Sequence, residues 1–183
     1  MTETPSFETI CSYNSDQLID YCFNIVKCHQ QFEKVTKLYP KSEKDSIQAI
    51  KFNKIVEGKS NVLVVVLTQY HLYGLFTEDP VPENCGGTVF EPNCAYIYEF
   101  FRDRKPLNPP TRYSLPTKKT YTFSTDISAS LFIFSGAMKI DKNQVQFFQR
   151  AKNLVDQNGN GGCFCGSTLQ KEVLRSIAIC QLE

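Results

Sequence analysis

The sequence predicts an α+β fold, in which a helix near the N-terminus precedes a set of mostly antiparallel strands. Apolar residues recur at helical spacing over residues 15–38, whereas from residue 61 onward they form short runs between turn formers. Two of these runs, 61–67 and 70–76, are separated by a gap of hairpin length. With 183 residues and 42% hydrophobic content, the chain can bury a core of its own. We expect at least five strands.

The predicted N-terminal helix runs from Ser15 to about Leu38, with Ser15 or Asp16 as its N-cap. Pro40 disfavours helix at the residue before it, so the helix should end there. The apolar positions of its buried face are Leu18, Cys22, Ile25, Val26, Phe32 and Val35. We therefore divide the chain into an N-terminal helical segment, 1–37, and a domain, 38–183.

The run NVLVVVL at 61–67 is rich in valine and has no polar interruption beyond its first residue. Such a run is typical of a strand covered on both faces, and 70–76 should be its antiparallel neighbour. Residues 96–101 alternate as a further strand. The segment RDRKPLNPPTRY then breaks the pattern, because Pro109 and Pro110 exclude a central strand.

The C-terminal half continues with short extended segments. Residues 120–123 and 130–135 read as strands, whereas 144–155 fits a helix or a strand equally poorly. The prolines and glycines of 77–94 predict a long surface loop. The apolar residues of 174–182 predict an extended segment that closes a sheet.

Charge and cysteine content favour a cytoplasmic, soluble protein. Twenty Lys and Arg residues balance 19 Asp and Glu residues, so no overall field favours nucleic acid. The N-terminus carries no secretory pattern, and the longest apolar run, 62–67, is too short to span a membrane. The eight cysteines lie mostly in apolar segments, which favours reduced thiols that fill the core.

The glycine-rich stretch QNGNGGCFCGST at 157–168 has the spacing of a phosphate-binding loop between Gly161 and Gly166. Serine stands where that loop needs lysine, and the preceding residues are poorly strand-like. We therefore predict a flexible turn and no nucleotide cofactor.

Cys163 and Cys165 in this stretch could act in metal or redox chemistry. A structural zinc site usually takes two clusters whose ligands lie two to four residues apart, and the only other spaced pair is Cys85 with Cys94, so we predict no metal. In an extended segment the two Cα atoms would lie about 6.6 Å apart, near the upper limit for a disulfide. A thiol-based redox protein that uses this pair remains an alternative function.

No catalytic constellation can be read from the sequence. His71 has no serine or acid partner at a recognisable spacing, and the acidic pair Glu78–Asp79 lies beside Pro80 in a predicted turn. We predict no catalytic residues. A divergent hydrolase that uses His71 is kept as a second alternative.

Several segments, taken in order, resemble a divergent TLDc domain, most closely the short TLDc-like proteins of amoeboid protists. They are LYPKSEKDS, FNKIVEGKSNVLVVVL, HLYGLF, SLFIF, GCFCGSTL and the closing IAICQLE, and together they cover 38–183. The matching positions of most interest are Asp45, Tyr73, Gly74, Gly166 and Glu183. Ser46 and Leu75 replace usual glycines, and tryptophan, which is common in the family, is absent.

The resemblance implies an antiparallel β-sandwich of two sheets with flanking helices. It also implies a non-enzymatic, regulatory role in resistance to oxidative stress, because several TLDc proteins bind the vacuolar proton pump and regulate its assembly. Subunits of that pump are therefore the expected partners, and no cofactor is expected.

Overall fold

The structure is a computed structural model that describes residues 4–39, 54–81, 95–114, 130–134, 138–141, 143–148, 151, 154–161 and 171–183. Helix α1 spans Phe7–Cys11 and helix α2 spans Ser15–Gln30. The strands of the described part are β1 (Val35–Tyr39), β2 (Val62–Thr68), β3 (Leu72–Thr77), β4 (Ala95–Arg102), β5 (Lys105–Ser114), β6 (Ser130–Phe134), β7 (Met138–Asp141), β8 (Gln144–Phe147), β9 (Val155–Asp156) and β10 (Lys171–Leu182).

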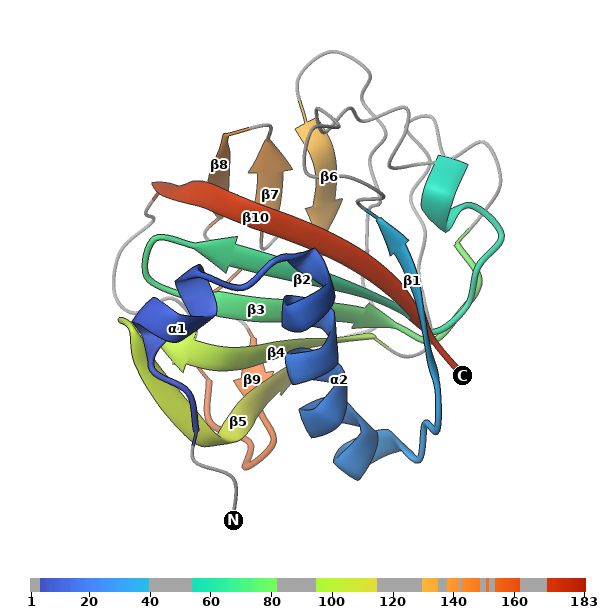
Figure 1. Cartoon of the computed structure of the whole chain (residues 1–183), viewed down its shortest axis with the longest axis horizontal. Helices are drawn as coiled ribbons and strands as arrows, with labels where there is room; N and C mark the ends of the chain where they lie inside the picture. The colour runs from blue at the N-terminus through green and yellow to red at the C-terminus, as the bar shows by residue number, and fades with distance from the viewer. Residues whose placement is uncertain are drawn as a thin grey trace.

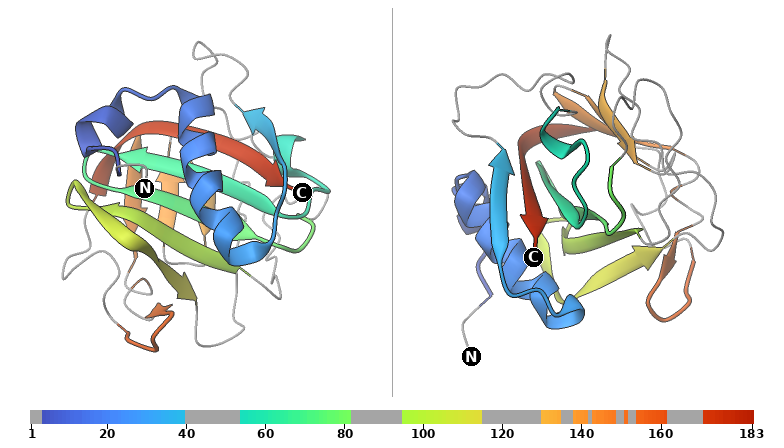
Figure 2. Two further views of the ribbon diagram at one scale, coloured as in Figure 1. Left: turned by 60° about the horizontal axis from the view of Figure 1, so that its bottom comes forward. Right: turned by 90° about the vertical axis from the view of Figure 1, so that its right-hand side faces the viewer.

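All of these strands pair antiparallel in one hydrogen-bonded path, β6-β7-β8-β10-β2-β3-β4-β5-β9, and β1 joins the path at β10. The path curls, so that β6, β7 and β8 stand across the concave side of β2 and β3, while α1 and α2 cover the convex side (Figures 1 and 2). The predicted α+β class, mostly antiparallel with an N-terminal helix, is confirmed.

Strand β10 occupies the centre of this path although it is the last element of the chain. Its first residues pair with β8, with Val173 opposite Gln144. The following residues pair with β2, from Leu174 to Gln181, and the final ones also pair with β1. The prediction of an extended C-terminal segment is confirmed, and this segment lies in the middle of the sheet between β8 and β2.

Strand β2 is buried on both faces, as its unbroken apolar run predicts. Val62, Val64 and Val66 belong to an inner core enclosed by the curled sheet. Leu63, Val65 and Leu67 belong to an outer core between the sheet and the two helices. Burying one such side chain contributes roughly 1.5–3 kcal/mol, which makes β2 a major source of stability.

Helix α2 differs from its prediction at both ends. Its N-cap is Asn14, whose side chain accepts from the backbone of Gln17 at 2.9 Å, while the Gln17 side chain accepts from the Asn14 backbone at 2.9 Å. The helix ends at Gln30 because Gln31 is left-handed, with φ of 45°. Residues 35–39 form β1 on the edge of β10, so the predicted division between 37 and 38 falls inside a strand and stays a prediction.

The break predicted at RDRKPLNPPTRY is wrong in part, because a two-residue turn there leads directly into β5. The two prolines still avoid the ladder, since the register with β4 shifts between the pairs Phe101–Pro106 and Glu99–Thr111. Residues 144–147 form a strand. The predicted strand at 120–123 and most of the predicted loop at 77–94 lie outside the described residues.

Gly74 lies in β3 where the outer core leaves no room for a side chain. A Cβ atom at this position would lie 2.9 Å from Phe100 Cε2 and 3.1 Å from Leu63 Cδ1. The close approach of these two side chains to the β3 backbone is therefore a physical reason for glycine at this position.

We predict that Gly74→Ala lowers the free energy of unfolding by about 1–3 kcal/mol, because the aromatic ring and the leucine must shift. Gly161→Ala is the matched control, since a Cβ there meets nothing within 4 Å. Urea unfolding of both variants checks the prediction. Equal stability of the two variants would contradict it.

Candidate functional site

Two turns and the start of a strand meet at one end of the sheet, on the left of Figure 1. They are the β2–β3 turn (69–71), the β4–β5 turn (103–104) and the start of β10 (171–173), which together we call the turn end. Arg104 N donates to Tyr70 O at 2.8 Å, and Gln69 N donates to Val173 O at 3.2 Å. Backbone hydrogen bonds thus join segments that are distant in the sequence.

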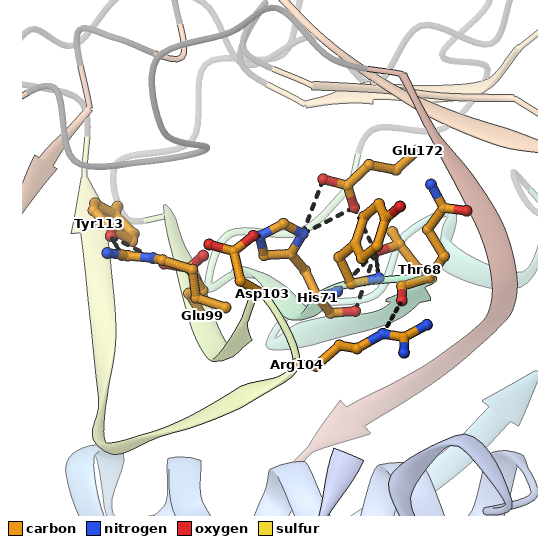
Figure 3. A network of polar contacts seen from close by, with 10 residues as sticks. Thr68, His71, Glu99, Asp103, Arg104, Tyr113 and Glu172 are labelled. Carbon is orange, nitrogen blue, oxygen red and sulfur yellow. Dashed lines mark hydrogen bonds and ion pairs between the residues drawn. The ribbon is translucent and has the colours of Figure 1, made fainter. Parts of the chain in front are cut away.

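The side chains of His71 and Glu172 form a buried polar contact inside the turn end (Figure 3). His71 Nδ1 lies 2.9 Å from Glu172 Oε1 and 3.0 Å from Oε2. The two side chains are only 7% and 2% exposed. A buried carboxylate is costly unless it accepts hydrogen bonds, so His71 compensates for the burial of Glu172.

Thr68 provides a further donor to this carboxylate and also shapes the turn. Its hydroxyl donates to Glu172 Oε2 and accepts from the backbone N–H groups of His71 at 2.9 Å and Tyr70 at 3.2 Å. A threonine that bonds to backbone amides two and three residues ahead stabilises a tight turn. The same side chain therefore fixes the turn and orients Glu172.

The other side of the His71 ring faces Asp103. His71 Nε2 lies 3.8 Å from Asp103 Oδ1, and the Asp103 side chain is 77% exposed. The ring also stacks on Tyr73, with centroids 5.3 Å apart and planes at 16°. Both nitrogens of His71 thus face carboxylates, and the imidazole is held from three sides.

A second buried acid, Glu99, lies opposite Tyr73 in the β3–β4 register. Arg102 Nε donates to Glu99 Oε2 at 3.1 Å, and Tyr113 Oη donates to the same oxygen at 3.1 Å. Across the inner face, each of the two buried acids therefore has a basic side chain and a hydroxyl next to it. Figure 3 shows the two groups side by side, with Asp103 between them.

The β4–β5 turn uses two left-handed residues that are not glycine. Asp103 has φ of 50° and Arg104 has φ of 63°. Two-residue hairpins of this kind strongly prefer Asn-Gly, and a left-handed residue with a side chain costs roughly 1–2 kcal/mol. Contacts to Tyr70 and His71 hold this turn in place.

The predicted family positions fall in different parts of the molecule. Tyr73 and Gly74 lie in β3, where Tyr73 contacts His71 and Gly74 faces the outer core. Glu183 lies at the far end of β10. Asp45 and Gly166 lie outside the described residues, as do the redox candidates Cys163 and Cys165.

Glu183 fastens the segment between α2 and β1. Its carboxylate accepts from Thr36 Oγ1 at 2.5 Å and from Lys34 Nζ at 3.2 Å. Its backbone carbonyl accepts from the N–H groups of Glu33 and Lys34, both at 2.8 Å. The hydrogen bond from Thr36, followed by that from Lys34, lowers the pKa of Glu183 below its ordinary value of 4.5.

Two of the described thiols fill the outer core, as predicted. Cys22 and Cys180 are fully buried. Burial raises the pKa of Cys22 well above 9.0 and that of Cys180 to about 12. A thiol with such a raised pKa is a poor nucleophile, so neither residue suits redox chemistry.

No protein-family model matches this chain, and a search of curated proteins found no match. The TLDc resemblance therefore stays a prediction. Within the described residues, no helix is long and apolar enough to cross a membrane. No three His, Cys, Asp or Glu side chains gather in a metal-binding group in the same part of the chain.

Sequence reasoning missed Thr68, Glu99 and Glu172, and it left His71 without a partner. The one local signal is the sequence Thr-Gln-Tyr-His at 68–71, in which a threonine precedes a histidine at turn spacing. Glu172 is 101 positions from His71, so no spacing rule connects them.

We predict that Glu172→Gln lowers the free energy of unfolding by about 2–4 kcal/mol, because the amide cannot accept from Thr68 and contact His71 with both of its terminal atoms as the carboxyl group does, and a buried polar group is left without a partner. Asp103→Asn is the control, since this exposed carboxylate should contribute less than about 1 kcal/mol. Thermal and urea unfolding of the two variants measure these changes in stability. Similar decreases in the free energy of unfolding of the two variants would contradict the larger contribution expected from the buried Glu172 carboxylate.

We predict that Glu183→Gln destabilises the protein at neutral pH and not in acid. The folded-state pKa of Glu183 is lowered, so its contribution is present above the unfolded value of 4.5 and is lost as the pH falls through the folded value. Urea unfolding of both proteins across this pH range checks the sign. A difference that persists or grows in acid would contradict the assignment.

Proposed function

We propose that the protein is a non-enzymatic, TLDc-like binding domain that acts through an exposed surface at its turn end. Tyr70 and Val173 are the exposed large hydrophobic side chains of the described part, at 40% and 54%. Both lie at the turn end, where a backbone hydrogen bond joins Gln69 to Val173. Adjacent exposed apolar residues mark a candidate protein contact, and this pair carries the proposal.

The buried network supports this role by holding the surface rigid. The imidazole of His71 and the carboxylate of Glu172 follow Tyr70 and precede Val173 in the chain, and both are enclosed by the sheet. A surface that is already ordered loses less conformational entropy when it binds a partner. The turn end is thus suited to recognition without rearrangement.

The resemblance supplies the proposed partner and process. We place the protein in the cytoplasm, where it would bind subunits of the vacuolar proton pump and contribute to resistance to oxidative stress. The domain would comprise 38–183, preceded by the helical segment 1–37. Strands β6, β7 and β8, which reach the rest of the sheet through the first residues of β10, would form part of the second sheet of a sandwich.

The hydrolase alternative has less support. A histidine oriented by a buried carboxylate is found in hydrolases, and His71 with Glu172 shares that feature. The far nitrogen of His71 faces the Asp103 carboxylate, however, and the Thr68 hydroxyl donates to Glu172. The redox alternative at Cys163 and Cys165 stays a prediction because both lie outside the described residues.

We predict that replacing Tyr70 and Val173 together with serine weakens the binding of purified pump subunits by at least about tenfold, because central apolar contacts dominate interface energy. Binding is measured by biolayer interferometry, and circular dichroism confirms folding.

Lys54→Ser is the control, since this exposed residue lies outside the turn end. Unaltered binding by the double variant would refute the surface. A wild-type protein that neither binds pump subunits nor changes pump activity would refute the partner.

A further inference from the structure

Arg104 is exposed in the β4–β5 turn, and its side chain is nevertheless held by several contacts. Its guanidinium carbon lies 5.9 Å from the ring centroid of Phe7 and 5.7 Å from that of Tyr70. Its Nε donates to Gln69 O at 3.3 Å, and its backbone N–H donates to Tyr70 O. Contacts to α1 and to the β2–β3 turn thus orient the guanidinium plane.

The terminal Nη atoms of Arg104 make no hydrogen bond to any described residue, whereas the Nη2 of Arg102 is bound to Glu99 and Tyr113. A positioned guanidinium with its two outer nitrogens available matches the two oxygens of a carboxylate. Stacking on the rings also lowers the entropy that such a side chain loses on binding. The geometry therefore favours a planar anionic group.

The charges around Arg104 favour the same class of ligand. The exposed charged residues at or beside the turn end are the basic Arg104, Lys105, Lys171 and Arg175 and the acidic Glu8 and Asp103. At the other end of the sheet the exposed charges of the described residues balance: Glu33, Glu78 and Glu183 stand against Lys34, Lys37 and Lys54. The local excess of exposed basic residues at the turn end therefore favours an acidic partner surface there.

We propose that Arg104 binds a carboxylate of an acidic partner segment whose apolar residue packs on Tyr70 and Val173. This inference rests on the proposed function, because it takes the turn end as a protein-binding surface. The two exposed apolar side chains favour a polypeptide over nucleic acid.

The left-handed turn gives independent support. Its two φ values, 50° and 63°, suit glycine, yet the positions hold aspartate and arginine. Unusual backbone conformations of this kind gather at binding sites, where the side chain matters more than the local strain. The backbone geometry of the hairpin therefore does not itself call for arginine at this position.

The test uses nuclear magnetic resonance of the full chain, with side-chain Nε–Hε signals of arginine as the readout. The probe is a blocked peptide with glutamates on both sides of a leucine, and its counterpart carries glutamines. The glutamate peptide should shift the Arg104 Nε–Hε signal and the amides of Tyr70 and Val173. The glutamine peptide should shift none of them.

Arg104→Lys keeps the charge and removes the planar fork, and it should weaken peptide binding by about tenfold. Arg175→Lys is the matched control and should change binding by less than about twofold. Melting temperatures of both variants establish that each is folded. Equal affinity of the two variants for the glutamate peptide would overturn the role of Arg104.

Two other anionic ligands, a lipid surface and a nucleic acid, are tested with the same Arg104 signal. Vesicles with phosphatidylserine or a single-stranded oligonucleotide that shift the Arg104 signal while the glutamate peptide does not would also overturn it. Peptide binding at Arg104 without any binding of pump subunits would support the site and refute the proposed partner. Absence of both peptide binding at Arg104 and binding of pump subunits would refute the turn end as a binding surface.

Discussion

The pairing of β10 with β2 is the contact on which the rest of the structure depends. It places the last residues of the chain between the inner and outer cores and gives β8 and β1 an edge to join. Glu172 and Glu183 lie at opposite ends of this one strand, and each carboxylate binds a distant segment. Because the contacts join residues more than a hundred positions apart, the loop entropy must be overcome before they stabilise the fold.

The sequence predicted correctly those elements whose structure depends mainly on neighbouring residues in the chain. The valine run of β2 reads as a strand buried on both faces because alternate side chains enter two different cores. The end of α2 could not be read in the same way. Val35 continues the helical spacing of the apolar residues. In the structure it nevertheless lies in strand β1 and pairs with Leu182 of β10, and only the position of β10 makes that pairing possible. The pairing with β10, which is distant in the sequence, therefore decided the structure at Val35 against the helical spacing of its apolar residues.

The candidate site was less predictable for the same reason. His71 could be noticed as a histidine and Thr68 as a turn former, but Glu172 acquires its role only when β10 lies beside β2. Its sequence neighbours, Lys171 and Val173, are both exposed, and nothing in that short segment distinguishes a buried acid from a surface one. Tyr73 and Glu183 were singled out by a family resemblance, and the contacts that each makes are visible only in the fold.

Stability and recognition make different demands on the turn end. Buried acids with dedicated donors are rarely the most stable way to fill a core, and apolar residues of similar volume often serve as well. Their directional contacts do restrict geometry, because Glu172 accepts from Thr68 and contacts His71 while Glu99 accepts from Arg102 and Tyr113. A hairpin that needed only to close would use glycine at its left-handed positions. The polar network of Glu172 and Glu99 beneath the turn, and the left-handed Arg104 within it, are the features that the proposed binding surface would use to present one guanidinium in one orientation.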